Sequence, residues 1–182
     1  HLFPELFLTG YPLQDLCLQK SFIDNYQDTL KELAKFGKKI KKDQVFLLGG
    51  LKYDLSKEGL PIDIKNVIYQ LDSEGLKDIY TKQLLPNYDI FDEQKYFTPG
   101  SASFIWEYQG KKIGLLICED MWASSFHHKD PVADLKELTD KNKVHLDAVF
   151  NLSASPYSIN KFEKRVQRSQ YISRLLQAPF FY

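Results

Sequence analysis

The sequence predicts one domain of mixed α and β structure. Its 182 residues, 43% of them hydrophobic, are enough to build one packed core. Segments with apolar residues three or four positions apart, as in amphipathic helices, occur among short continuous apolar runs that are typical of buried strands. No internal repeat and no Pro/Gly/Ser-rich linker interrupts the chain, so we assign residues 1–182 to one domain.

The first half is expected to contain one helix and three strands. Residues 21–40 have the helical spacing of apolar side chains and end at a glycine followed by a lysine cluster. The strands are expected at 45–51, closed by Gly49 and Gly50, and then at 66–71 and 76–85, on either side of a turn at 72–75.

The second half is expected to alternate between strands and helices. Residues 102–108 and 112–118 form a hairpin around a Gly-containing turn. A helix over 131–138 carries proline in its first turn, and a strand over 146–152 follows. Asn160 and Glu163 form a capping-box pattern that opens a last helix reaching about residue 177, and residues 180–182 begin another strand.

Charge and hydropathy exclude several classes of partner. The 24 basic and 24 acidic residues balance, which predicts no nucleic-acid binding. No apolar run approaches the ~20 residues that span a bilayer, and no secretion signal opens the chain, so a cytoplasmic protein is expected. Cys17 and Cys118 are expected to be reduced thiols. The start without methionine and the apolar end suggest a fragment, incomplete at both ends.

Three segments carry side chains suited to catalysis. Cys118 ends an apolar strand and precedes two carboxylates, where it is either a nucleophile or a buried structural thiol. Glu5 is the one carboxylate of an apolar stretch, and is either a general base or a surface acid. Lys82 lies in a strand-like run. It is either a cation that stabilises an oxyanion or a solvated lysine at a strand edge.

The order and frames of these segments resemble a known family. Phe-Pro-Glu-Leu around Glu5, Lys-Gln-Leu-Leu-Pro-Asn-Tyr from Lys82, and Ile-Cys-Glu-Asp-Met-Trp around Cys118 are similar to the nitrilase, or carbon-nitrogen hydrolase, superfamily. Residues 82–100 further resemble the glutaminase domains of glutamine-dependent NAD synthetases. The resemblance implies an α+β fold of the nitrilase type, a four-layer α-β-β-α sandwich.

The resemblance also implies roles for individual residues. Cys118 would be the nucleophile, Glu5 the general base and then acid, and Lys82 the cation beside the tetrahedral intermediate, with Glu93 as an additional glutamate of the site. The residues that it implies for glutamine binding are Tyr88, Glu119, Trp122, Ser153 and Ser155, with Glu119 as partner of the substrate ammonium group.

Some of these residues have plainer interpretations. Ser153 and Ser155 also suit a simple turn before the last helix. Lys161 and Arg165 are interpreted as part of the solvated face of that helix. His127 and His128 are adjacent and point apart, so no metal site is expected.

The implied function is hydrolysis of the glutamine side-chain amide through a cysteine thioester. The ammonia would serve amidation of nicotinic acid adenine dinucleotide by a synthetase domain that this chain does not contain. ATP and magnesium would belong to that domain, and no cofactor is expected in this chain. A homo-oligomer is expected. The alternatives are a free-standing aliphatic amidase and an inactive structural fragment.

Overall fold

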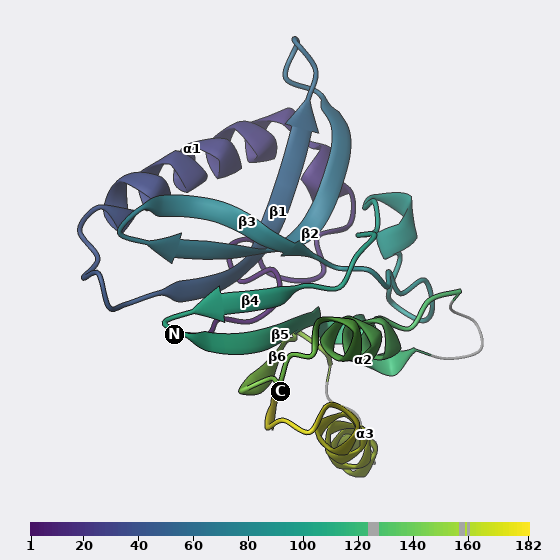
Figure 1. The fold of residues 1–182 in the computed structure, drawn as a ribbon. Helices are drawn as coiled ribbons and strands as arrows, with labels where there is room; N and C mark the ends of the chain where they lie inside the picture. The colour runs from purple at the N-terminus through teal and green to yellow at the C-terminus, as the bar shows by residue number, and fades with distance from the viewer. Residues whose placement is uncertain (124–127, 157–158, 160) are drawn as a thin grey trace. The chain divides into compact units, whose positions relative to one another are not determined.

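The computed structural model describes residues 1–123, 128–156, 159 and 161–182. The chain divides into two compact units. The first unit consists of His1–Thr81 and Leu85–Gly100, and the second of Lys82–Leu84 and Ser101–Tyr182. Each has its own sheet and apolar core (Figure 1). The assignment of residues 1–182 to one domain stays a prediction.

The first unit is an antiparallel sheet with one long helix. Strands β1 (Phe46–Leu55), β2 (Pro61–Asp72) and β3 (Gly75–Thr81) follow one another in the order β1-β2-β3. Helix α1 (Lys20–Gly37) lies along this sheet, as Figure 1 shows, and buries Ile23 and Tyr26. The 3-10 helices η1 (Gln14–Leu18) and η2 (Glu93–Lys95) complete the unit. The predicted helix and three strands are all present.

Gly49 and Gly50 do not close the strand that contains them. Strand β1 continues five residues beyond the pair to Leu55, paired with β2 along its length. The physical reason is that residues 1–6 run beside β1: Phe3 N–H donates to Leu47 O, and Leu47 N–H donates to His1 O, both at 2.9 Å. A side chain at Gly49 would collide with the backbone of Pro4, Glu5 and Leu6. The glycine allows this close approach of two backbones.

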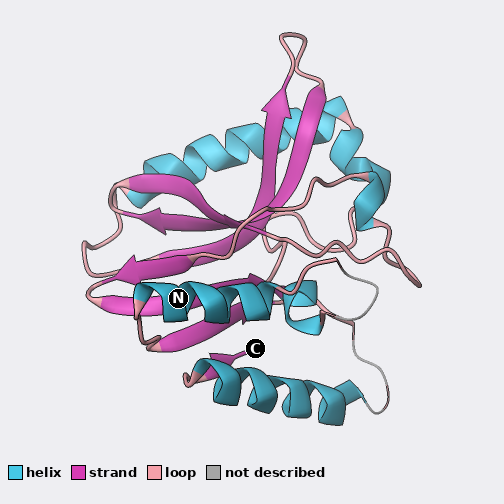
Figure 2. Ribbon diagram, turned by 45° about the vertical axis from the view of Figure 1, so that its right-hand side comes forward, coloured by secondary structure: helices cyan, strands magenta, loops and turns pink. Residues whose placement is uncertain are grey.

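The second unit contains a mixed sheet and two helices. Strands β4 (Ile105–Tyr108), β5 (Lys111–Ile117), β6 (Ala148–Leu152) and β7 (Phe180–Phe181) lie in the order β4-β5-β6-β7. The first pair is antiparallel and the other two pairs are parallel. Helices α2 (Pro131–Asn142) and α3 (Lys161–Leu176) are the crossovers that parallel pairing requires (Figure 2). The core includes Leu116, Met121 and Leu135.

Several boundaries differ from those that the sequence predicts. Strand β3 ends at Thr81, so Lys82 follows a strand instead of lying inside one. The β4–β5 turn has only two residues, Gln109 and Gly110, both with positive φ, as twisted hairpins favour. Helix α2 extends four residues beyond its predicted end to Asn142. Asn160, the predicted cap of α3, and His127 lie outside the described residues. In the part described, no helix is long and apolar enough to cross a membrane.

Candidate active site

Cys118 lies on a sharp turn between a strand and a helix of the second unit. Strand β5 ends at Ile117, and the 3-10 helix η3 (Cys118–Trp122) begins at the cysteine itself. Its φ is +43°, in the left-handed region that residues with a Cβ seldom adopt. Such a conformation costs on the order of 1–3 kcal/mol and is concentrated at functional sites. The side chain is only 8% exposed, so burial alone does not distinguish a nucleophile from a structural thiol.

The carboxylate of Asp120 ties this turn to the Lys82 segment. Asp120 Oδ1 accepts from the backbone N–H groups of Gln83 and Leu84, at 2.9 and 2.8 Å. Asp120 Oδ2 accepts from the N–H of Ile117 at 3.0 Å. The aspartate side chain is fully buried. The residue after Lys82 and the residue before Cys118 are therefore fixed by the same side chain.

Two further side chains of the second unit hold the turn. Asn151 of β6 donates from Nδ2 to Cys118 O at 3.5 Å and contacts Met121 Sδ at 3.0 Å. Arg168 of α3 donates from Nε to Met121 O. The turn is thus bonded to the neighbouring strand and to the following helix, which helps to maintain the strained backbone at Cys118.

Lys82 is the largest fully buried side chain of the described residues. It is 1% exposed, which excludes the solvated strand-edge lysine that its sequence context left open. A buried ammonium group is costly unless it is compensated, and buried lysines are frequent in catalytic sites. Glu119 is also buried, and Trp122 packs against the core of the second unit.

The loop after β6 is bonded to the start of α3. Ser155 Oγ accepts from Lys161 Nζ and from an Arg165 Nη, each at 3.1 Å, and both cations also donate to Pro156 O. The interpretation of Lys161 and Arg165 as a solvated face is wrong, because both are half-buried and hold this loop. Ser153 Oγ donates to Tyr182 Oη at 3.4 Å.

Glu5 belongs to the first unit, where it is buried. It is 2% exposed, and its Oε1 accepts from Asn66 Nδ2 of β2 at 2.9 Å. The surface-acid interpretation is therefore excluded. The backbone of the preceding residues pairs with β1. The close approach at Gly49 fixes the position of Glu5 along the strand. A buried, hydrogen-bonded carboxylate at a fixed position is suited to proton transfer.

Glu93 and Tyr88 also belong to the first unit and share neighbours. Glu93 is buried at the start of η2, and its Oε1 accepts from Tyr11 Oη at 2.8 Å. The Tyr11 and Tyr88 rings both contact the ring of Phe91, with centroids 6.0 and 5.3 Å away. Tyr88 is 52% exposed, so it provides an accessible aromatic surface beside a buried carboxylate.

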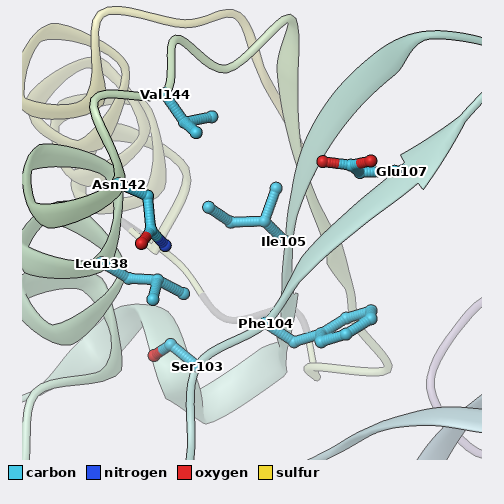
Figure 3. Close-up of a pocket in the computed structure, with 7 residues that line it drawn as sticks. All are labelled: Ser103, Phe104, Ile105, Glu107, Leu138, Asn142 and Val144. Atoms are coloured by element: carbon cyan, nitrogen blue, oxygen red, sulfur yellow. The ribbon is translucent and has the colours of Figure 1, made fainter.

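A hollow elsewhere in the second unit holds none of the predicted site residues. It has a volume of about 470 Å³ and lies between β4 and the end of α2 (Figure 3). Its lining includes Ile105, Leu138 and Val144, with Glu107 and Asn142 at its margin. Its polar lining consists of Ser103, Glu107 and Asn142, with no cysteine, and it is not the candidate site. Within the described ranges, no three His, Cys, Asp or Glu side chains are grouped as a metal site would require.

The family profile that describes carbon-nitrogen hydrolases matches residues 1–129. This range contains Glu5, Lys82 and Cys118. The chain belongs to the carbon-nitrogen hydrolase family. It is 34% identical over its whole length to the glutamine-dependent NAD(+) synthetase of Acinetobacter baylyi, and 37% identical over 172 residues to that of Thermotoga maritima.

Solved structures confirm the predicted nitrilase-type α+β fold. The glutamine-dependent NAD+ synthetase of Acinetobacter baumannii, in complex with ADP, superposes on the entire hydrolase chain with a TM-score of 0.76 and 30% identity. A nitrilase-superfamily amidase from Nesterenkonia AN1 matches 94% of the chain with a TM-score of 0.62 and 16% identity, which supports the fold alone. The chain spans 30% of the Acinetobacter baylyi relative and 26% of the Thermotoga maritima one.

The sequence did not predict the residues that hold the candidate catalytic groups. Asp120 and Asn66 make the contacts described above, but the sequence alone shows each only as a polar residue in an expected turn or strand. The one sequence feature that could have indicated the role of Asp120 is its position two residues after the cysteine. A weaker indication for Asn66 is that it is an amide inside a strand of apolar and β-branched residues. Nothing in the sequence distinguished Arg168 from the other polar residues of its helix.

Proposed function

We propose that this chain hydrolyses the side-chain amide of glutamine through a thioester on Cys118 and so supplies ammonia. The observation that carries the proposal is the strained Cys118 turn, joined by Asp120 to the segment of the buried Lys82. A thiol on a strained turn together with a buried ammonium group suits attack on a carbonyl and stabilisation of the resulting oxyanion.

The proposed chemistry is acyl transfer to a thiol. Glu5 takes the proton of the Cys118 thiol, and the sulfur attacks the amide carbon of glutamine. Lys82 and the backbone N–H of Glu119 stabilise the oxyanion, for which one donor contributes about 2.7–4 kcal/mol in comparable sites. The tetrahedral intermediate collapses, Glu5 returns the proton to the leaving nitrogen, and ammonia departs. Glu5 then deprotonates water, which attacks the thioester and releases glutamate and the thiol.

The remaining predicted residues would recognise glutamine and support this chemistry. Glu119 would pair with the substrate ammonium group, and Tyr88 and Trp122 would provide aromatic surface. Ser153 or Ser155 would donate a hydroxyl group, and the cations that hold Ser155 place positive charge at its loop, where a substrate carboxylate is favoured. Glu93 would be the additional glutamate of the site. These assignments rest on the family resemblance, and Glu93 and Glu119 are also buried.

The ammonia would be used by a synthetase domain outside this chain. The named relatives are glutamine-dependent NAD(+) synthetases, and this chain matches about a third of their length or less. We propose amidation of nicotinic acid adenine dinucleotide as the use of the ammonia, with ATP and magnesium bound by the synthetase domain and no cofactor in this chain. A cytoplasmic homo-oligomer is part of the same proposal.

A test follows from the two cysteines. In the full-length protein, Cys118→Ala should abolish ammonia release from glutamine, whereas the matched Cys17→Ala should retain it, because Cys17 is fully buried in the other unit. Acetamide and propionamide are the comparison substrates. A strong preference for glutamine supports the glutaminase, and a preference for the simple amides supports the free-standing amidase instead. Full activity in Cys118→Ala would overturn the proposal.

A further inference from the structure

We infer that Asp120 is a positioning residue for the hydrolysis, which anchors the Lys82 segment to the Cys118 turn and acts through Lys82. The inference rests on the proposed function and assigns a role to a side chain that the proposed mechanism does not use. Asp120 touches neither the substrate nor the reacting atoms in that mechanism. It acts through three backbone N–H groups.

The two oxygens of the carboxylate bind different segments. Oδ2 accepts from Ile117, three residues away, and so closes the turn in which Cys118 lies. Oδ1 accepts from Gln83 and Leu84, which are 37 and 36 residues away in sequence. An ordinary turn cap makes only the first kind of contact. The second kind joins the turn to a distant segment.

Both bonded segments adjoin a candidate catalytic residue. Gln83 directly follows Lys82, and Ile117 directly precedes Cys118. Strand β3 ends at Thr81, so regular strand pairing does not hold Lys82 in place. The Lys82–Leu84 stretch groups with the second unit, while the residues on either side of it group with the first. The Asp120 bonds to Gln83 and Leu84 join this stretch to the second unit.

Burial makes the arrangement rigid. Asp120 is fully buried, so water does not replace a lost acceptor. Hydrogen bonds from N–H groups to a carboxylate are stronger than those to a neutral oxygen. An amide cannot replace this group, because Asn has one acceptor oxygen and its NH2 group would face an N–H donor on the other side. Asp120→Asn therefore breaks one of the two connections while it keeps the volume of the side chain.

Asp130 offers a matched control. Its Oδ1 also accepts from two backbone N–H groups, those of Val132 and Ala133, at 3.0 and 3.1 Å, but these belong to the first turn of α2. Both donors converge on one oxygen, and Asn is as good a helix cap as Asp. Asp130→Asn should leave the hydrolysis unchanged.

The experiment measures glutamine hydrolysis by the full-length protein carrying Asp120→Asn, Asp130→Asn, Lys82→Ala or both Asp120→Asn and Lys82→Ala. We expect Asp120→Asn to lower kcat about 100-fold with little change in KM, the size of effect that a misplacement of about 1 Å produces. If Asp120 acts through Lys82, the double variant should be scarcely slower than Lys82→Ala alone. Circular dichroism checks folding, and if Asp120→Asn does not fold, Asp120→Glu is measured with the same expectation.

Activity of Asp120→Asn within about twofold of wild type would overturn the inference, since a 100-fold loss is expected. The inference would also be overturned if the kcat losses of Asp120→Asn and Lys82→Ala multiplied fully in the double variant, because Asp120 would then act independently of Lys82. Failure of the proposed function gives a different pattern, in which Cys118→Ala retains the activity. The two ideas can therefore fail separately.

Discussion

Replacing Gly49 by alanine should displace Glu5. An alanine Cβ at this position would lie 2.2 Å from Pro4 O, 2.5 Å from Leu6 N and 2.6 Å from Glu5 Cα. All three are backbone atoms, so no side-chain rotation relieves the overlap. Ordinary contacts begin near 3.4 Å. The Pro4–Leu6 backbone must therefore retreat by roughly 1 Å, a displacement that can cost about 100-fold in rate when it moves a catalytic group.

The assay compares Gly49→Ala with Gly37→Ala. At Gly37, the end of α1, the added Cβ would lie 2.6 Å from Asp72 O, so a backbone overlap also occurs there, away from Glu5. Each variant should lose about 1–3 kcal/mol of unfolding free energy, measured with urea, because overpacking strains the core. Only Gly49→Ala should also lose about 100-fold in the kcat of glutamine hydrolysis by the full-length protein.

Two results would refute this reasoning. Wild-type kcat and stability in Gly49→Ala would mean that the segment does not lie against β1 as described. Equal losses of kcat in both glycine variants would mean that activity follows global stability and not the position of Glu5.

Three further predictions concern single side chains. Burial raises the pKa of the Cys17 thiol to about 11, so at pH 8 iodoacetamide should leave it unmodified in the native protein, as peptide mass spectrometry would reveal, and label it once urea unfolds the chain. Asn66→Ala removes a donor from the buried Glu5 carboxylate and should cost about 1–3 kcal/mol in urea unfolding; an unchanged midpoint would contradict the contact. The hydrogen bond from Lys65 lowers the pKa of Asp63 below 3.8. This stabilisation is present above pH 3.8 and is lost as the pH falls through the lowered pKa, so Asp63→Asn should show a smaller drop in melting temperature between pH 5 and pH 2 than wild type.

The sequence predicted the regular elements because periodicity reflects local burial. The spacing of apolar residues in α1 and the β4–β5 hairpin both correspond to the structure within a few residues. The prediction at Gly49 failed for a physical reason. Glycine in sequence often marks a turn, whereas Gly49 accommodates a second backbone whose approach is a tertiary contact. No local pattern reports such a contact.

The candidate site was predictable only in its reactive side chains. Family motifs singled out Glu5, Lys82 and Cys118, and the structure resolves the ambiguity of the first two by burying them. The groups that hold them, Asn66 and Asp120, depend on partners more than 30 residues away. Lys161 was misjudged although its partner Ser155 is near in sequence, because helical spacing does not reveal that the preceding loop returns to contact the helix.

The most direct test of Cys118 as the nucleophile is covalent labelling with a diazo-ketone analogue of glutamine, followed by intact mass and peptide mapping of the folded full-length protein. A diazo-ketone is attacked by a nucleophile positioned for the glutamine amide. We predict one adduct, on Cys118, that excess glutamine blocks and that Glu5→Gln and Lys82→Ala abolish or slow strongly. No adduct on folded protein, or an adduct on Cys17, would contradict the claim that Cys118 is the nucleophile of a glutaminase.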